Sequence, residues 1–339
     1  MTRWKRIPIF RSFCALLAAC WCAACATRAA EPPLAWRSPH GRDHALAGRI
    51  LDVAAQRPIA EAQLFDRLAR ADVVVLGEKH DNPDHHAIQA RVVDALVVRG
   101  RRPALAFEML DEDDAAPLAR ARRDAPGDAE AIRRAVGWDA SGWPAWSLYA
   151  PLFERAVAAE LPVVAANLAP GALRAVSRGG VGALDAGRIA RLALAPEAAA
   201  HERAVLADAV RASHCGMAGE ARIDRMVDVQ RVWNAQLGSA ALGAARAAPD
   251  GAAVLVAGNE HARRDVGEPA AIARIDPSVR VVAVALLEVD PRRPDADPAA
   301  AYGAQPPFDY VWTTPRVDLA DPCEQYREAL EQMRAPQPE

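Results

Sequence analysis

Two copies of the pattern Gly-x-x-His are far apart in the sequence, and each contains a glutamate between its glycine and its histidine. They read Gly77-Glu78-Lys79-His80 and Gly258-Asn259-Glu260-His261. Two imidazoles with neighbouring carboxylates suit zinc, manganese, iron or cobalt. Without a metal, the same groups could act as general base and acid on a bound substrate. The spacing therefore predicts a metal or acid–base site whose parts are about 180 residues apart.

The elements that would position these groups are short apolar runs separated by longer amphipathic stretches. Five runs predict strands, over residues 71–77, 103–108, 161–167, 252–258 and 279–287. Runs without polar alternation indicate strands covered on both faces, as in a parallel sheet flanked by helices. Asn82 and Pro83 are typical of a helix start and Gly100 of its end, which completes a βαβ unit. We predict an α/β fold with a central, mostly parallel sheet flanked by helices and with helical insertions.

Polar residues stand at the ends of these runs. The ligand crevice of an open α/β sheet lies outside the carboxyl ends of its strands, so we expect these residues to meet there. Glu108 ends an otherwise apolar run, where an unpaired carboxylate is costly, and joins Glu78 as a candidate catalytic group. The expected metal ligands are Glu78, His80, Glu108 and His261, and the other crevice residues are Lys79, Asn167, Asn259 and Glu260. The ordinary alternative for the histidines is a surface or hydrogen-bonded role, and for Lys79 it is a solvated loop lysine.

Composition excludes several classes of protein. The 339-residue chain has 41 Lys and Arg against 44 Asp and Glu, a formal net charge of −3, whereas a nucleic-acid-binding surface needs a basic excess. Hydrophobic residues make up 52% of the chain, which excludes wholesale disorder. Most of the six cysteines lie within the first 25 residues. Only Cys215 and Cys323 remain for the body, and the sequence leaves open whether they pair.

The first 25 residues have the form of a bacterial export signal. A basic head precedes an apolar stretch that is shorter than the roughly 20 residues of a spanning helix and ends in small residues. Leu17–Cys20 and Cys22–Cys25 each have the form of a lipobox, so we expect one of Cys20 and Cys25 to be lipidated. The expected parts are a signal peptide over 1–25, a linker over 26–44, one α/β domain over 45–325 and a tail over 326–339. The expected location is the cell envelope, anchored by lipid to the outer membrane and facing the periplasm.

Longer motifs around these positions resemble the ChaN-like, iron-regulated haem-binding lipoproteins. The resemblance runs over about residues 45–325 and begins with Leu76–Gln89. It continues through Phe107–Met109, Leu148–Leu152, Pro162–Leu168, Ser213–Cys215, Met226–Gln230, Ala257–Pro269 and Asp309–Pro315. The wider group includes Tiki metalloproteases and erythromycin esterase-like enzymes, whose two Gly-x-x-His motifs and glutamate match Gly77–His80, Gly258–His261 and Glu108. Glu260 departs from the pattern, because family members are expected to carry Gly there.

The resemblance implies haem binding and a role in iron acquisition, with components of a haem-uptake system as further partners. In the characterised type, haem is thought to sit at a dimer interface with a tyrosine ligand, which implies a homodimer. Tyr149 stands in a matching segment, and His85 and His86 open the helix after the first motif. These three are the candidate haem ligands. Core packing of Tyr149 and solvent exposure of the two histidines are the alternatives.

Two other functions stay open on the sequence. Glu78, His80, Glu108 and His261 could form the site of a metal-dependent hydrolase, in which a divalent transition metal lowers the pKa of a bound water and polarises a carbonyl. The third hypothesis is an envelope protein that has a vestigial crevice and only binds a partner. The sequence favours haem binding, because the resemblance covers nearly the whole chain after the export signal.

Overall fold

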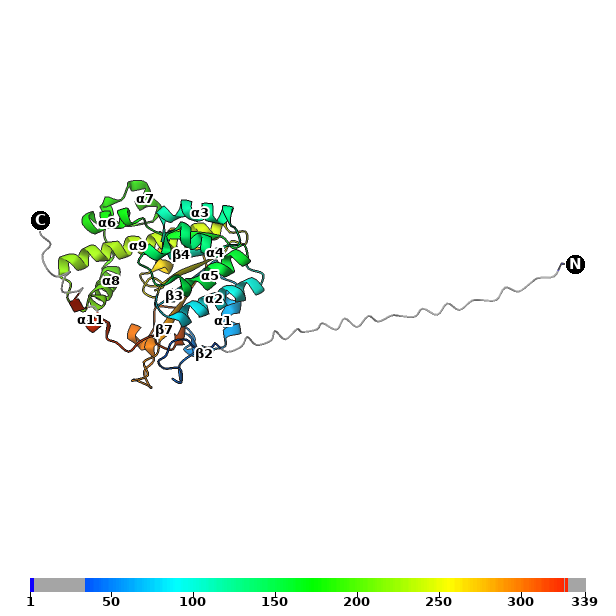
Figure 1. Ribbon diagram of the computed structural model, residues 1–339, viewed down its shortest axis with the longest axis horizontal. Helices are drawn as coiled ribbons and strands as arrows, with labels where there is room; N and C mark the ends of the chain where they lie inside the picture. Colours follow the sequence, from blue (N-terminus) through cyan, green and yellow to red (C-terminus); the bar gives the residue numbers. More distant parts are fainter. Residues whose placement is uncertain (3–33, 326, 329–339) are drawn as a thin grey trace. The chain divides into compact units, whose positions relative to one another are not determined.

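The computed structural model describes residues 1–2, 34–325 and 327–328. The chain divides into two units, Met1–Ala35 and Trp36–Glu339, and the second is built around one β-sheet with helices on both sides (Figure 1). Cys20 and Cys25, with nearly all of the expected signal peptide, lie outside the described residues, as does most of the expected tail. Within the described ranges, no helix has both the length and the apolar character needed to cross a membrane.

Eight strands form a single sheet in the order β2-β1-β8-β7-β3-β6-β4-β5. Their bounds are β1 Ile50–Asp52, β2 Arg57–Ile59, β3 Val73–Glu78, β4 Ala104–Asp111, β5 Val163–Asn167, β6 Ala253–Gly258, β7 Val281–Glu288 and β8 Tyr310–Thr314. The pairs from β8 to β5 are parallel, and β1 and β2 extend one edge antiparallel. The mostly parallel α/β sheet is therefore confirmed. Strands β1, β2 and β8 are additional to the five expected ones, and β1 and β2 are only three residues long.

The helices cover both faces of the sheet. Their bounds are α1 Glu61–Leu68, α2 Pro83–Val98, α3 Ala115–Asp124, α4 Ala129–Ala135, α5 Trp146–Ala158, α6 Pro170–Gly179, α7 Ala186–Arg191, α8 Ala200–Ser213, α9 Glu220–Ala247, α10 Glu268–Ile275 and α11 Pro322–Gln325. Single-turn 3₁₀ helices are η1 Glu112–Asp114, η2 Trp138–Ala140, η3 Val181–Ala183 and η4 Pro298–Tyr302. Helix α9 lies against one face and α1, α2 and α5 lie on the other (Figure 1), and α10 packs against α9 and β7.

Helix α2 follows directly from local sequence chemistry. The Asn82 side chain accepts hydrogen bonds from the backbone N–H groups of Asp84 and His85, which satisfies two of the free donors at the helix start. Pro83 occupies the first turn, where its missing N–H costs nothing. Gly100 has a φ of +80°, a left-handed conformation that ends the helix without strain. The helix therefore begins and ends where the sequence predicts, and its start lies beside the first Gly-x-x-His segment.

The two central strands are buried along their whole length. Every residue of β3 and of β6 is buried, as expected for strands covered on both faces. Val73 and Val75 of β3 share a core cluster with Leu237 and Ala241 of α9. A Cβ on Gly238 of α9 would lie 3.1 Å from a backbone oxygen of α10, so glycine there lets the two helices pack closely. This packing fixes the strand ends on which the candidate site stands.

The segment after β8 runs along the carboxyl edge of the sheet and is tied down at several points. The Asn82 side chain donates to the carbonyl of Pro315, and the backbone N–H of Val317 donates to Glu288. Cys323 then forms a disulfide with Cys215 in the α8–α9 loop, 108 residues away in the sequence, with 5.7 Å between the two Cα atoms. The pairing that the sequence leaves open is therefore present.

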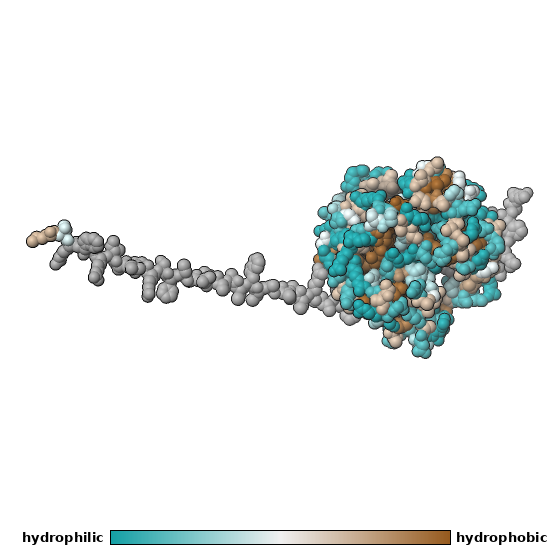
Figure 2. Space-filling view, turned by 180° about the vertical axis from the view of Figure 1, so that it is seen from behind, coloured by the Kyte–Doolittle hydropathy of each residue, from teal (hydrophilic) through white to brown (hydrophobic). Residues whose placement is uncertain are grey.

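The first part of the compact unit differs from the expected domain organisation. Residues 37–44, assigned to the linker from the sequence, pack against the body of this unit. The backbone N–H groups of Arg37 and Ser38 donate to Asp84, and His40 forms an isolated β-bridge with Arg316. Because these N–H groups are bound to the buried Asp84 of α2, the folded unit begins at Trp36. Figure 2 shows one face of this unit, on which hydrophilic residues predominate and hydrophobic residues are interspersed.

Candidate functional site

The register of the sheet brings the two Gly-x-x-His segments side by side. Strands β3 and β6 are neighbours, and Glu78 at the end of β3 is opposite Gly258 at the end of β6. A Cβ on Gly77 would lie only 2.5 Å from Asn259 Oδ1, so glycine is needed for this close approach. Asn259 is held by both ends of its amide, because Nδ2 donates to Leu286 O and Oδ1 accepts from the Leu286 N–H.

Glu78 and His80 form the first carboxylate–imidazole pair of the site. His80 Nδ1 is 2.9 Å from Glu78 Oε1, and Glu78 is 2% exposed. The Tyr149 hydroxyl donates to Glu78 Oε1 at 2.5 Å, and Gln89 Nε2 donates to Glu78 Oε2 at 2.7 Å. Each carboxylate oxygen is thus hydrogen-bonded, which makes the burial of this charge tolerable.

The electrostatics of this pair follow from its partners. Burial alone would raise the pKa of Glu78, but the charges of His86 and His80 and the hydrogen bonds from His80 and Tyr149 outweigh it and hold that pKa below its usual value. Burial also lowers the pKa of His80, but the hydrogen bond to Glu78 and the charge of Glu108 raise it overall. Burial and the Glu78 charge raise the pKa of the Tyr149 phenol, which keeps it a neutral donor.

Glu108 and His261 form a second pair on the other side of β6. The two groups approach to 3.4 Å between His261 Nε2 and Glu108 Oε1. Glu108 Oε2 accepts the Gly258 N–H at 2.7 Å, and His261 Nδ1 is 2.6 Å from Asn234 Oδ1. Burial would raise the pKa of Glu108, but the interactions with His261, the His80 charge and the Gly258 N–H lower it overall. Asn167 supports the backbone of Glu108 and not its carboxylate, because the Asn167 side chain donates to the Glu108 carbonyl oxygen.

The two imidazoles meet over Gly258. A Cβ at that position would lie 3.3 Å from both Nε2 and Cε1 of His80 and 3.7 Å from Cδ2 of His261. Residues that are far apart in the sequence therefore approach the same point. Each ring also lies against a tryptophan, because Trp143 packs edge-on to His80 and Trp233 is tilted against His261, both with ring centroids 5.1 Å apart.

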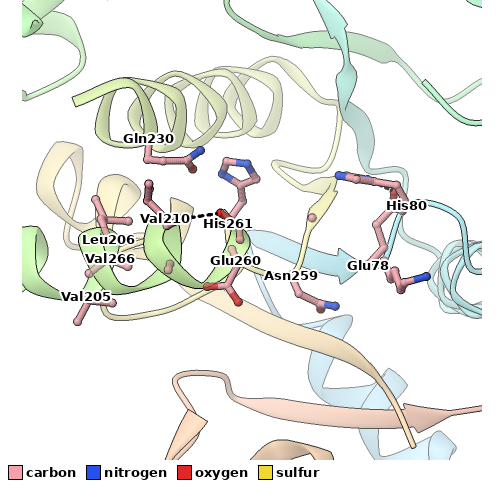
Figure 3. A pocket seen from close by; sticks show the side chains of 14 residues that line it. Glu78, His80, Val205, Leu206, Val210, Gln230, Asn259, Glu260, His261 and Val266 are labelled. Carbon is pink, nitrogen blue, oxygen red and sulfur yellow. Dashed lines mark hydrogen bonds and ion pairs between the residues drawn. The ribbon is translucent and has the colours of Figure 1, made fainter. Parts of the chain in front are cut away.

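A cavity of about 470 Å³ opens beside these pairs. Both Gly-x-x-His segments line one side of it, and Gln230 of α9 is also part of its wall. The apolar residues of the wall are Val205, Leu206, Ala209, Val210 and Val266. In Figure 3 the side chains of Val205, Leu206 and Val210 lie on one side of His261, and His80 lies on the other. The cavity is therefore amphipathic, with histidines at one end and aliphatic side chains at the other.

A second, more polar cavity of about 860 Å³ lies on the far side of Lys79 and Asn259, which line both. Lys79 is 2.6 Å from Asp81 and within 4 Å of Glu288 and Asp318. Acidic groups therefore already surround the lysine ammonium. On the first cavity, Glu260 is paired with Arg263 at 3.3 Å and accepts the Tyr302 hydroxyl at 2.8 Å.

A metal centre is not evident in this geometry. Leaving aside residues 3–33, 326 and 329–339, which the structure does not describe, no group of three or more His, Cys, Asp or Glu side chains is arranged to hold a metal ion. The four expected ligands Glu78, His80, Glu108 and His261 come together as two separate pairs. Both carboxylates are already occupied by hydrogen-bond donors. Metal binding by this set stays a prediction.

The three expected haem ligands are all core residues that do not line the 470 Å³ cavity, although His85 lines the second one. Tyr149 is fully buried and its hydroxyl is bound to Glu78. His85 Nδ1 accepts the Lys79 N–H and its Nε2 is 2.9 Å from Thr314 Oγ1, while burial and the His86 and Lys79 charges hold its pKa well below the usual value. His86 Nε2 is 2.9 Å from the carbonyl oxygen of His80. All three brace the loop after β3, and solvent exposure of the two histidines is wrong.

Several residues of the site are not among the candidates predicted from the sequence. Gln89 and Asn234 bind Glu78 and His261 from helices, and the tertiary structure reveals these roles. Glu268 is 0% exposed, and neither of its carboxyl oxygens has a hydrogen-bond partner within residues 34–325. Burial and the Glu108 charge raise the pKa of Glu268 well above its usual value. A charged residue directly before a proline at a helix start normally indicates an exposed cap, which is why its burial is unexpected.

Comparison with known proteins gives one family match and several matches among solved structures. Residues 64–272 match the family model described as haem-binding uptake, Tiki superfamily, ChaN. No curated protein matches. A solved structure of ChaN of Campylobacter jejuni, described as showing cofacial haem binding, is 22% identical with a TM-score of 0.62 and covers 78% of this chain and 95% of its own. An erythromycin esterase, EreC, in its open conformation is 13% identical with a TM-score of 0.39 over 89% of this chain and 88% of its own. The type III effector HopBA1 is 14% identical with a TM-score of 0.40 over 74% of this chain and 91% of its own.

Proposed function

The chain belongs to the haem-binding uptake family of the Tiki superfamily that includes ChaN, and from this premise we propose that it binds haem as a lipid-anchored protein of the cell envelope. The observation that carries the proposal is the amphipathic cavity within the matched region. That region includes both Gly-x-x-His segments and all of α8, which supplies most of the apolar wall. The protein of similar fold from Campylobacter jejuni is described as binding haem cofacially, which supports haem as the ligand class.

The residues of the cavity fit the chemistry of haem. Haem is a flat, largely apolar ligand that needs an axial donor atom and a slot that limits solvent access. Aliphatic side chains of α8 and Val266 provide apolar contact, and His80 lines the same cavity with a ring nitrogen. Burial of apolar surface supplies affinity, at roughly 25 cal/mol per Å² removed from water.

Titration of the purified protein with haemin, followed through the Soret band, tests this proposal. Saturation at a fixed haemin-to-protein ratio with a shifted band is the expected result, and absence of a shift at stoichiometric haemin contradicts it. Ala209 lines the cavity, so Ala209→Phe should weaken binding by filling the slot. Ala204→Phe is the matched control, because Ala204 is exposed on the same helix and does not line the cavity.

The envelope location and the lipid anchor rest on the sequence. The basic and apolar segments of residues 1–25 support export, and Cys20 and Cys25 are the two candidate acylation sites. We propose an outer-membrane anchor facing the periplasm, and haem-uptake components as partners. Fatty-acid labelling and detergent partitioning of Cys20→Ser and Cys25→Ser test the anchor, because only one of the two changes should abolish both signals. Induction of the protein under iron starvation tests the role in iron acquisition.

A hydrolase of the Tiki and erythromycin esterase type is the second candidate function. The observation that favours it is that two buried carboxylates each hold one imidazole beside the cavity. Buried Glu–His pairs are an arrangement suited to general acid–base work on a bound substrate, with or without a divalent metal. Metal analysis of protein purified without chelator, beside His80→Ala and His261→Ala, tests the metal-dependent version. Equally little metal in wild type and both variants removes that version.

A further inference from the structure

Helix α8 supplies most of the apolar wall of the 470 Å³ cavity, yet it lies one layer away from the sheet. It packs on α9, which in turn packs on the strands. The buried apolar cluster that it shares with its surroundings is small and consists of Leu206, Ala207, Val210, Ile223, Val227 and Val266. The position of the wall therefore depends on this cluster and on the ties at the two ends of the helix.

The start of α8 is held by a buried ion pair. Glu202 Oε2 is 3.2 Å from Nε of Arg231 on α9, and the side chain of Arg231 is only 2% exposed. Glu202 Oε1 is also 3.6 Å from Nη1 of Arg274 on α10. Separating such a pair would leave a buried charge without a partner, which is strongly unfavourable. This end of the wall is firmly attached to the body.

The other end of α8 is held by the disulfide. The helix ends at Ser213, and Cys215 follows in the turn to α9, where it has a left-handed φ of +55°. The ion pair between Arg211 and Glu220 near this end is 2.8 Å long, but the two side chains are 41% and 74% exposed. Exposed pairs contribute little to stability. The covalent bond from Cys215 to Cys323 is therefore the stronger tie at this end.

The segment that carries Cys323 is itself attached to the carboxyl edge of the sheet. The backbone N–H of Val317 donates to Glu288, the last residue of β7, at 3.0 Å. Nη1 of Arg292 donates to the carbonyl oxygen of Leu319 at 3.1 Å. Helix α11, with Cys323, lies beside α8 (Figure 1). The disulfide thus connects the far end of the cavity wall to a segment that the sheet holds in place.

The bond is open to exchange with an external thiol, because both Cys215 and Cys323 are partly exposed. A dithiol reductant such as dithiothreitol attacks one sulfur as a thiolate and forms a mixed disulfide. Its second thiol then displaces that sulfur and closes a ring. The protein disulfide gains two electrons and two protons and becomes two thiols, while the dithiol loses the same number and becomes a cyclic disulfide.

We propose that the Cys215–Cys323 disulfide is a redox-sensitive latch on the cavity, which holds the end of the α8 wall when oxidised and releases it when a dithiol reduces it. With the bond closed, α8 is fixed at both ends. With the bond open, the helix stays attached at Glu202, and its last turns, which carry Ala209 and Val210, are free to move away from the two histidine segments. This inference concerns access to the cavity and goes beyond the proposed function.

Hydrogen–deuterium exchange of the full chain, resolved by peptide mass spectrometry, tests the latch. Wild type, wild type reduced with dithiothreitol, and the double variant Cys215→Ser with Cys323→Ser are compared at pH 7. Peptides over residues 206–213 should exchange about 10-fold or more faster once the bond is open, because removing a native disulfide typically costs more stability than a tenfold change in an opening equilibrium requires. Peptides of β3 and β6 should exchange as in wild type.

Two controls separate the bond from other effects. Dithiothreitol should not change exchange in the double variant any further, which excludes effects of the reagent on other cysteines. Asp224→Asn removes the exposed ion pair between Arg203 of α8 and Asp224 of α9, and it should leave exchange in α8 as in wild type. Unchanged exchange in α8 after the bond is opened overturns the proposal. Equal acceleration in α8, β3 and β6 also overturns it, because the bond would then support the whole unit and not the wall.

Haemin titration of the double variant distinguishes a failure of the latch from a failure of the proposed function. Weaker haemin binding by the double variant than by wild type supports control of the cavity by the bond. Equal affinity overturns that control while the proposed function stands. If neither protein binds haemin, the proposed function is wrong, and hydrogen exchange in α8 decides the latch.

Discussion

Glu268 provides a test of the buried electrostatics behind the site. Its side chain is fully buried at the start of α10, with no protein partner for either carboxyl oxygen within residues 34–325 and with Glu108 as a like-charged neighbour. The folded protein therefore favours the neutral form of Glu268. Each pH unit over which the folded protein keeps a proton that the unfolded chain releases lowers stability by up to about 1.4 kcal/mol. Its unpaired polar atoms add about 1–3 kcal/mol.

Replacement of Glu268 by Met removes both costs and keeps a flexible side chain of similar length. We expect Glu268→Met to raise the free energy of unfolding at pH 7 by more than the about 1–3 kcal/mol of the unpaired polar atoms. Because the raised pKa lets the folded wild type bind more protons than the unfolded chain above pH 4.5, wild-type stability falls as pH rises, by up to about 1.4 kcal/mol per unit relative to the variant. The stability gap should therefore shrink steadily as pH is lowered from 7 to 4.5.

Urea unfolding of both proteins at pH 5, 6 and 7, followed by far-ultraviolet circular dichroism, measures this gap. Glu197→Met is the matched control, because Glu197 is exposed and its replacement should give no such pH-dependent gap. A gap that does not change with pH, or a variant less stable than wild type at pH 7, refutes the reasoning. Either result would mean that Glu268 is charged and paired in the folded protein.

Three further predictions concern the frame of the site. Glu78→Gln should destabilise the protein above pH 4.5, because the folded state lowers the pKa of Glu78. The difference in melting temperature between wild type and variant should close as the pH falls through that lowered pKa, and a pH-independent difference contradicts this. Cys215→Ser opens a disulfide that spans 108 residues and should lower the free energy of unfolding by about 2–5 kcal/mol in denaturant titrations, whereas unchanged stability means that the bond does not form. Gly77→Ala places a Cβ 2.5 Å from Asn259 Oδ1 and should lower the melting temperature, unlike Gly127→Ala, where nothing lies within 4 Å.

Local patterns in the sequence predict much of the fold. The apolar runs around Val75 and Leu255 predict the central strands, because a strand covered on both faces must be apolar throughout. Asn82 and Gly100 mark the ends of α2 through cap chemistry that depends only on neighbouring residues. Strands β1 and β2 escape prediction because three residues show no periodicity. Strand β2 pairs only with β1, and β1 pairs with β8, whose sequence is far from both.

The position of the candidate site can be predicted from the sequence, but the roles of its individual side chains cannot. His80 and His261 come together because both follow parallel strands, and strand ends of one sheet share an edge. Which nitrogen is free, however, depends on partners from other elements, such as Asn234 on α9 for His261. The burial of Tyr149 likewise depends on the packing of α5 against α2, which leaves no periodic trace in the sequence.

The most direct measurement is the position of the iron in crystals of the haemin-loaded protein, located by anomalous scattering. The account predicts an iron peak in the cavity of about 470 Å³, beside Gly258 and facing the aliphatic side chains of α8. An iron peak elsewhere on the chain, or crystals grown with stoichiometric haemin that contain no iron in this cavity, would contradict it.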